Sequence, residues 1–239
     1  MIAPRIWIGL TAVVLLGSAC GSAANPQIAE KTSTTSKPSA SAPPVTHQLQ
    51  VGKVGFGQDQ YGLAFAVALL TNPSNTDGAE STTVQFSAYD ANNQVIGTAT
   101  ESLTLMRAGQ AMASGNMFTV PQGAKIALVK AQVATETWAK DPHPEAVILT
   151  QNTKFNAGQY GNNSINGELV SKYQSNLKQV IATAVCYDGG ANIIGGGFTF
   201  VDLLPGGGTA GVTIHPTVTA TPASCEMYGN ISNLSLIGT

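Results

Sequence analysis

The chain has 239 residues, a formal net charge of −2, 10% charged residues and 26 glycines. This length gives room for two small domains or one large one. The charge balance excludes the basic surface that nucleic-acid binding requires, and it gives no basic membrane patch. Few charges with many glycines are typical of a secreted all-β protein rather than a helical one.

The first twenty residues form a leader pattern. Arg5 supplies a positive charge, and residues 6–16 form an apolar run too short for an ordinary membrane span. The run ends in Leu16-Gly-Ser-Ala-Cys20, which resembles a bacterial lipobox. The resemblance implies that the signal peptide, residues 1–19, is removed and that the Cys20 sulfur carries fatty acyl chains such as palmitate. A plain secretory peptide with cleavage nearby is the alternative.

Two acyl chains make a stable membrane anchor, whereas one chain is marginal. We therefore expect a lipoprotein of the cell membrane, anchored through Cys20, with its folded part on the extracytoplasmic side. Residues 20–46 consist mainly of Ser, Thr, Ala, Pro and Lys. Such a composition buries too little apolar surface to offset the entropy of ordering, so these residues are predicted to be a disordered tether.

Residues 47–138 are predicted to form a first β-module. Residues 63–71 are a dense apolar run of strand length, and residues 72–78 have the composition of a loop. Residues 83–89 alternate between apolar and polar side chains, as a half-buried strand does. Asp90 opens a hairpin turn because its side chain can bond to its own backbone. Further strands are expected near residues 95–105, 113–120 and 126–134.

Residues 139–146 are a short, Pro-bounded connection, so we expect the two modules to touch. Trp138 stands at its start and is the only tryptophan left after processing. Packing into the interface between the modules is its expected role.

Residues 147–239 repeat the first module. Phe86-Ser-Ala-Tyr-Asp90 followed by Val95-Ile-Gly97 returns as Ala184-Val-Cys-Tyr-Asp188 followed by Ile193-Ile-Gly195. Tyr61 likewise returns as Tyr160. Extended without gaps, this register places Cys186 on Ala88 and Cys225 on Ala127. The repeat therefore predicts two copies of the same module, related by internal duplication.

With Cys20 acylated, Cys186 and Cys225 form an even pair in an oxidising compartment. A disulfide between them is the natural inference. It closes a loop of 39 residues (225 − 186), for which chain entropy gives about 4 kcal/mol of stabilisation.

Two copies with several short strands each predict tandem β-sandwiches, and a single closed barrel of two halves is the alternative. The pattern Phe86-x-x-Tyr89-Asp90 with Val95-Ile-Gly97 resembles the FxLYD-type domains of bacterial lipoproteins. The resemblance implies small immunoglobulin-like β-sandwiches and no enzyme activity. The first copy has Ala88 where the motif has Leu, and the second has Ala184 where it has Phe.

No pattern in the sequence indicates catalysis, a metal or a cofactor. The three histidines, His47, His143 and His215, lack zinc spacing, and no Gly-x-Ser-x-Gly elbow is present. The glycine triplets at 195–197 and 206–208 lack the Lys-Ser/Thr of a phosphate-binding loop. The chain is therefore expected not to be an enzyme.

Two functions remain open. The first is a lipid-anchored module that binds an envelope or extracellular protein or polymer through loops or an edge strand. The alternative is a small-molecule or carbohydrate binder with a site between the copies, near Trp138, Tyr61 and Tyr160.

Overall fold

The computed structural model describes residues 47–233 and 235, and it is all-β apart from one short 3-10 turn, η1 (Gln159–Gly161). The first copy contains β1 (Gln50–Gln58), β2 (Leu63–Thr71), β3 (Asp77–Tyr89), β4 (Val95–Met106), β5 (Ala111–Thr119) and β6 (Leu128–Lys140). The second copy contains β7 (Ile148–Asn156), β8 (Ser164–Ser171), β9 (Leu177–Tyr187), β10 (Ile193–Leu204), β11 (Thr209–Ile214), β12 (Thr217–Val218) and β13 (Ser224–Asn230).

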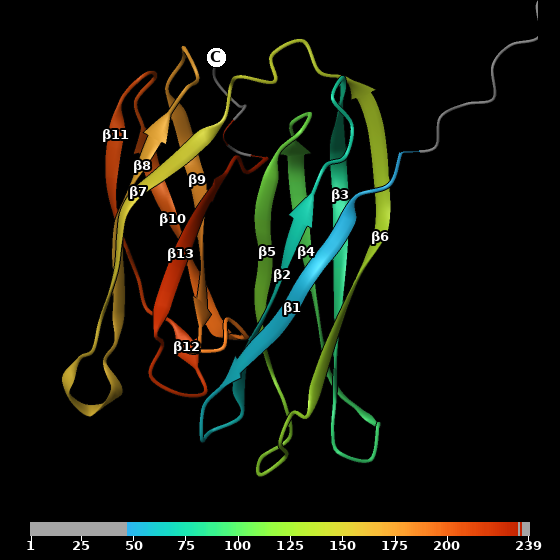
Figure 1. The fold of residues 1–239 in the computed structure, drawn as a ribbon, viewed down its shortest axis with the longest axis vertical. Helices are drawn as coiled ribbons and strands as arrows, with labels where there is room; N and C mark the ends of the chain where they lie inside the picture. The colour runs from blue at the N-terminus through green and yellow to red at the C-terminus, as the bar shows by residue number, and fades with distance from the viewer. Residues whose placement is uncertain (1–46, 234, 236–239) are drawn as a thin grey trace, which may run out of the picture. The chain divides into compact units, whose positions relative to one another are not determined.

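The strands form four antiparallel sheets, two in each copy (Figure 1). In the first copy β1-β2-β5 faces β4-β3-β6, and in the second copy β11-β8-β7 faces β12-β10-β9-β13. The prediction of an all-β chain with two tandem immunoglobulin-like sandwiches is confirmed. Four separate sheets replace the alternative of a single closed barrel.

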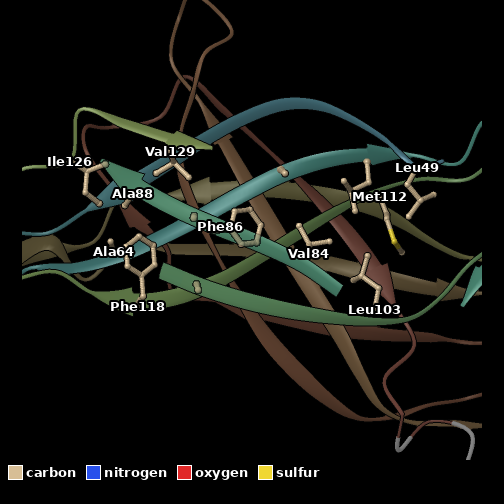
Figure 2. Packing of buried hydrophobic residues seen from close by; sticks show 14 of the residues in the cluster. Leu49, Ala64, Val84, Phe86, Ala88, Leu103, Met112, Phe118, Ile126 and Val129 are labelled. Carbon is tan, nitrogen blue, oxygen red and sulfur yellow. The ribbon is translucent and has the colours of Figure 1, made fainter. Parts of the chain in front are cut away.

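Each sandwich has its own apolar core. In the first copy, alternate residues of β3 point inward, and Val84, Phe86 and Ala88 are fully buried (Figure 2). Leu169, Leu177 and Leu204 are among the buried residues of the second core. Strand alternation accounts for both cores, because one face of each sheet is apolar and turned toward its partner sheet.

The strand register confirms the internal repeat and corrects its end. Tyr187 pairs with Ile193 as Tyr89 pairs with Val95, and Phe155 pairs with Ile165 as Phe56 pairs with Ala66. These pairs give offsets of 98 for β3 and β4 (187 − 89) and 99 for β1 and β2 (155 − 56).

The ungapped alignment is wrong in the last strand. Cys225 pairs with Cys186 on β9, and the residue that pairs with Ala88 on β3 is Val129. The offset there is 96 (225 − 129), so the counterpart of Cys225 is Val129 and not Ala127, which is exposed. The second copy therefore lacks two residues between β11 and β13.

The repeated Asp closes its hairpin in both copies. Asp90 Oδ1 accepts hydrogen bonds from the backbone N–H groups of Asn92 at 2.9 Å and Gln94 at 2.8 Å. Asp188 Oδ1 does the same for Gly190 at 2.9 Å and Asn192 at 2.8 Å. The predicted role of Asp90 as a turn cap is confirmed, and the motif marks the fold.

The predicted signal peptide, Cys20 and the tether, residues 1–46, lie outside the described residues. Within the described part of the chain, no helix is long and apolar enough to cross a bilayer.

Candidate functional site

The two sandwiches are joined by a third apolar cluster. Phe65 and Val67 of β2 and Ala113 of β5 pack against Val185 and Tyr187 of β9, and all of them are buried. These side chains point away from their own sandwich cores. The outer face of one sheet in the first copy is therefore buried against the outer face of a sheet in the second.

Two glycines let the backbones approach closely at this junction. A Cβ atom at Gly57 of β1 would lie 1.9 Å from the carbonyl oxygen of Thr217, next to β10. A Cβ atom at Gly195 of β10 would lie 2.9 Å from the Cα atom of Gly57. Any side chain at these positions would push the sandwiches apart, because no real Cβ atom lies so near the backbone.

An ion pair fixes the connection between the copies. Arg107, after β4, donates to Asp141 Oδ1 at 2.8 Å and to the Ala146 carbonyl at 3.2 Å, and its guanidinium lies over the Tyr173 ring at 5.4 Å. The Asp141 side chain is 1% exposed. Burial opposes its ionisation, but hydrogen bonds from the Ala108 N–H and from Arg107 outweigh burial and lower the pKa of Asp141. The connection is thus held against both sandwiches.

The structure does not bring the predicted binding residues together. Trp138 lies within β6, not in the connection, and it packs on the core of the first copy. Tyr61 is 78% exposed in the β1–β2 turn. The ring of Trp138 stacks on His47, before the start of β1, with centroids 5.0 Å apart, so Trp138 and Tyr61 lie at opposite ends of β1. Tyr160 belongs to η1, and its side chain lies outside the described residues.

A groove lies at the edge of the first sandwich, between β1 and β6. We call it the edge groove, and its volume is about 1040 Å³. It is lined by residues before and in β1, in the β2–β3 loop and in β6, namely His47, Gln48, Leu49, Gln50, Val51, Pro73, Ser74, Asn75, Thr76, Ala131, Gln132 and Val133. None of them is Asp, Glu, Lys or Arg, so the lining combines apolar and uncharged polar side chains with His47, whose Nε2 lies 3.2 Å from Asp77 Oδ2.

The same edge is narrower in the second copy. Its groove lies between β7 and β13, is also lined by Gln110 and Ala111 of the first copy, and measures about 330 Å³. Thr150 of β7 donates a hydrogen bond to the Met227 carbonyl of β13 at 2.7 Å across this groove. The register makes Val51 the counterpart of Thr150 and Ala131 the counterpart of Met227. Valine has no hydroxyl to make this bond. The first copy is bridged at another point, where the Leu49 N–H donates to Glu136 Oε2 of β6 at 3.3 Å.

A smaller groove lies at the junction itself, with a volume of about 510 Å³. Lys53 and Leu69 line it from the first copy, and Tyr187 and Glu226 line it from the second. The Tyr187 hydroxyl donates to Glu226 Oε2 at 3.1 Å, and burial together with this carboxylate raises the pKa of Tyr187 to about 12. Sequence reasoning missed this groove, because its residues come from both copies and share no motif.

The predicted disulfide is present between Cys186 and Cys225, two residues that face each other on β9 and β13. Within the residues that the structure describes, no group of three or more His, Cys, Asp or Glu side chains is placed to hold a metal ion. Glu101 of β4 has a carboxyl group whose pKa is raised to about 7 by desolvation.

No family model matches this chain, and no curated protein matches it. Among solved structures, the crystal structure of red sea bream transglutaminase is similar, with 15% sequence identity and a TM-score of 0.26. The match covers 78% of this chain and 29% of that chain. A likeness this distant gives no information on activity or ligands.

Proposed function

We propose that this protein is a non-enzymatic lipoprotein of the cell membrane that displays a pair of β-sandwiches to bind an envelope or extracellular protein or polymer. The lipobox-like sequence ending at Cys20 supports anchoring, and the tether-like composition of residues 21–46 supports display away from the membrane. The observation that carries the binding role is the edge groove, an opening of about 1040 Å³ beside β6, where the second copy has a groove of about 330 Å³.

Anchoring is tested by growing cells that express the chain with an alkyne analogue of palmitate. The wild-type chain should take up the label and stay with the membrane fraction, whereas the Cys20→Ser variant should lose both properties. A labelled Cys20→Ser chain, or an unlabelled wild-type chain, would contradict the anchor.

The tether is tested by deleting residues 21–45. Capture of partners by crosslinking in intact cells should fall, because the sandwiches would lie against the membrane. The melting temperature of the purified chain should not change. A matching loss of thermal stability would show that this segment belongs to the fold.

The junction groove supports a second candidate, the binding of a small molecule or carbohydrate between the copies. Its Lys53 amine and Glu226 carboxylate offer hydrogen bonds to such a ligand. Envelope sugars and small metabolites titrated against the wild-type chain and a Glu226→Gln variant would test it. Equal responses of the two proteins would count against this site.

A further inference from the structure

We propose that the edge groove binds an extended, uncharged segment of a partner protein, which adds to the β4-β3-β6 sheet as a new strand beside β6. This inference rests on the proposed function, because it names the kind of partner and the place where it binds.

Strand β6 is 13 residues long and forms one edge of its sheet, with β3 as its partner. In the described part of the chain, no backbone–backbone hydrogen bond from residues 128–140 runs outside the β3–β6 ladder. In an antiparallel pair, about half of an edge strand's N–H and C=O groups point away from its partner. An unpaired row of this length is complementary to another extended backbone.

The comparison with the second copy shows that this opening is specific to the first. Its counterpart β13 is 7 residues long, and the Thr150 hydroxyl ties its Met227 carbonyl to β7. In the first copy Val51 and Ala131 occupy these positions, and both line the wider groove. The difference between the two grooves therefore comes from these side chains, from the length of the edge strand, and from Gln110 and Ala111 of the first copy, which line the second groove.

At the opposite edge of the same sheet, strand β4 has features that discourage pairing with another strand. Glu101 of β4 lies on the inward face between Ala99 and Leu103, and inward-pointing charges on edge strands discourage pairing with another chain. Asn116 Nδ2 of β5 also bonds the Thr100 carbonyl of β4 at 2.8 Å. Lys130 of β6 extends over the Tyr89 ring, 5.0 Å from its centre, which places its charge on the sheet face instead of in the groove.

The groove lining sets the chemistry of the partner segment. Val51, Ala131 and Val133 offer apolar contacts toward the sandwich core. Gln48, Gln50 and Asn75 offer amides at the rim. A segment with small aliphatic side chains on one face and hydroxyl side chains on the other satisfies both. No lining residue is Asp, Glu, Lys or Arg, and the neighbouring carboxylates Asp77 and Glu136 already contact His47 and the Leu49 N–H, so the lining offers little to a charged strand.

The test measures binding of fluorescein-labelled dodecapeptides by fluorescence anisotropy, with the full mature chain carrying Cys20→Ser to keep it soluble. The probes are three copies of Thr-Val-Ser-Ala, of Thr-Ile-Ser-Val or of Thr-Leu-Ser-Leu. At least one probe should bind saturably at one per chain. The same peptide N-methylated at alternate residues should bind at least ten-fold more weakly, because it cannot donate to the β6 carbonyls.

Two matched variants locate the site. Gln50 and its counterpart Leu149 both line a groove and are both exposed, so a tyrosine at either position should leave the fold intact. Gln50→Tyr should raise the dissociation constant at least ten-fold, and Leu149→Tyr should change it less than two-fold. Equal effects of the two variants would overturn the proposal.

Four further results of the binding experiment would contradict strand addition to β6. No saturable binding by any of the three peptides, or equal binding of the N-methylated peptide, would overturn strand addition. A response to tetra-N-acetylchitotetraose without a response to peptides would assign the groove to saccharides instead. A chain dimer in sedimentation velocity that excludes the peptides would assign β6 to self-pairing. Because Cys20 is replaced throughout, a failure of the lipid anchor does not affect these results.

Discussion

The outer faces of β2 and β8 occupy equivalent positions in the two copies and have opposite characters. Phe65, Val67 and Leu69 of β2 correspond to Ser164, Asn166 and Glu168 of β8. The reverse holds on the other sheet, where Thr100 of β4 corresponds to Phe198 of β10. Each copy is therefore apolar on the one outer face that meets its neighbour and polar on the face that does not.

This divergence explains why the duplication gives a closed pair instead of an open series. A sheet face of the first copy meets a different sheet face of the second, which is a heterologous contact, and such contacts repeat indefinitely unless the end faces differ. Polar end faces stop the series, as the capping repeats of repeat proteins do. The edge groove also differs between the copies, because the Thr150 hydroxyl that crosses the smaller groove of the second copy has no counterpart at Val51.

The disulfide is the largest expected difference between the copies. Replacing both cysteines, Cys186→Ala with Cys225→Ala, removes the constraint on a 39-residue loop and should lower the free energy of unfolding by about 4 kcal/mol. Urea unfolding followed by circular dichroism measures this loss.

Ala88→Cys with Val129→Cys places cysteines at the equivalent facing positions of the first copy and should raise its stability. No gain there would contradict the assigned register.

Changes at the junction between the two sandwiches have the next largest expected effect on stability. Phe65→Ser gives β2 the residue that β8 carries, and it empties a fully buried site, so we expect a loss of about 3 kcal/mol. Small-angle scattering should also report looser coupling of the two sandwiches. The matched change Ser164→Ala lies on the free face and should cost little. Similar losses in the two variants would show that the outer faces are not specialised.

Glu101→Gln should stabilise the protein above neutral pH. The pKa of Glu101 is raised from 4.5 to about 7, so the folded state binds this proton more tightly than the unfolded state does. Stability therefore falls as pH rises from 4.5 to 7, and the penalty is complete above that range. We expect a gain of roughly 2 kcal/mol at pH 8, allowing for partial exposure, and almost none at pH 4.5. A gain that does not depend on pH would contradict the raised pKa.

The smallest expected effect concerns one pair that changed chemistry between the copies. Lys130 lies over the Tyr89 ring, whereas its counterpart Glu226 accepts a hydrogen bond from Tyr187. Lys130→Gln removes an exposed cation–π contact and should cost about 0.5 kcal/mol. Thermal unfolding at low and high salt measures it, and a cost above 2 kcal/mol would require a further role for Lys130.

Much of the fold could be predicted from particular residues. The recurrence of Tyr-Asp and Ile-Gly at one spacing predicted the two modules, and the even cysteine pair predicted the disulfide. The counterpart of Cys225 was wrong by two residues, because the segment between β11 and β13 carries no shared motif to reveal the deletion. The signal for the junction was present in β2, whose residues 64–70 are apolar on both faces, whereas β8 alternates. A strand buried on both faces requires a second layer outside its own sandwich.

The edge groove could not be predicted, since it depends on which backbone groups of β6 are left unpaired and on the absence of one hydroxyl at Val51. Trp138 was expected between the copies. It packs instead against His47, which lines the edge groove.

The most direct measurement is hydrogen–deuterium exchange of the Cys20→Ser chain with and without a bound dodecapeptide. Strand addition predicts slower exchange across residues 128–140 of β6, because its outward amides gain partners, and unchanged exchange across residues 224–230 of β13 in the same molecule. Equal protection of β6 and β13, or no protection of β6 at saturation, would contradict the claim that the first copy alone keeps an open edge.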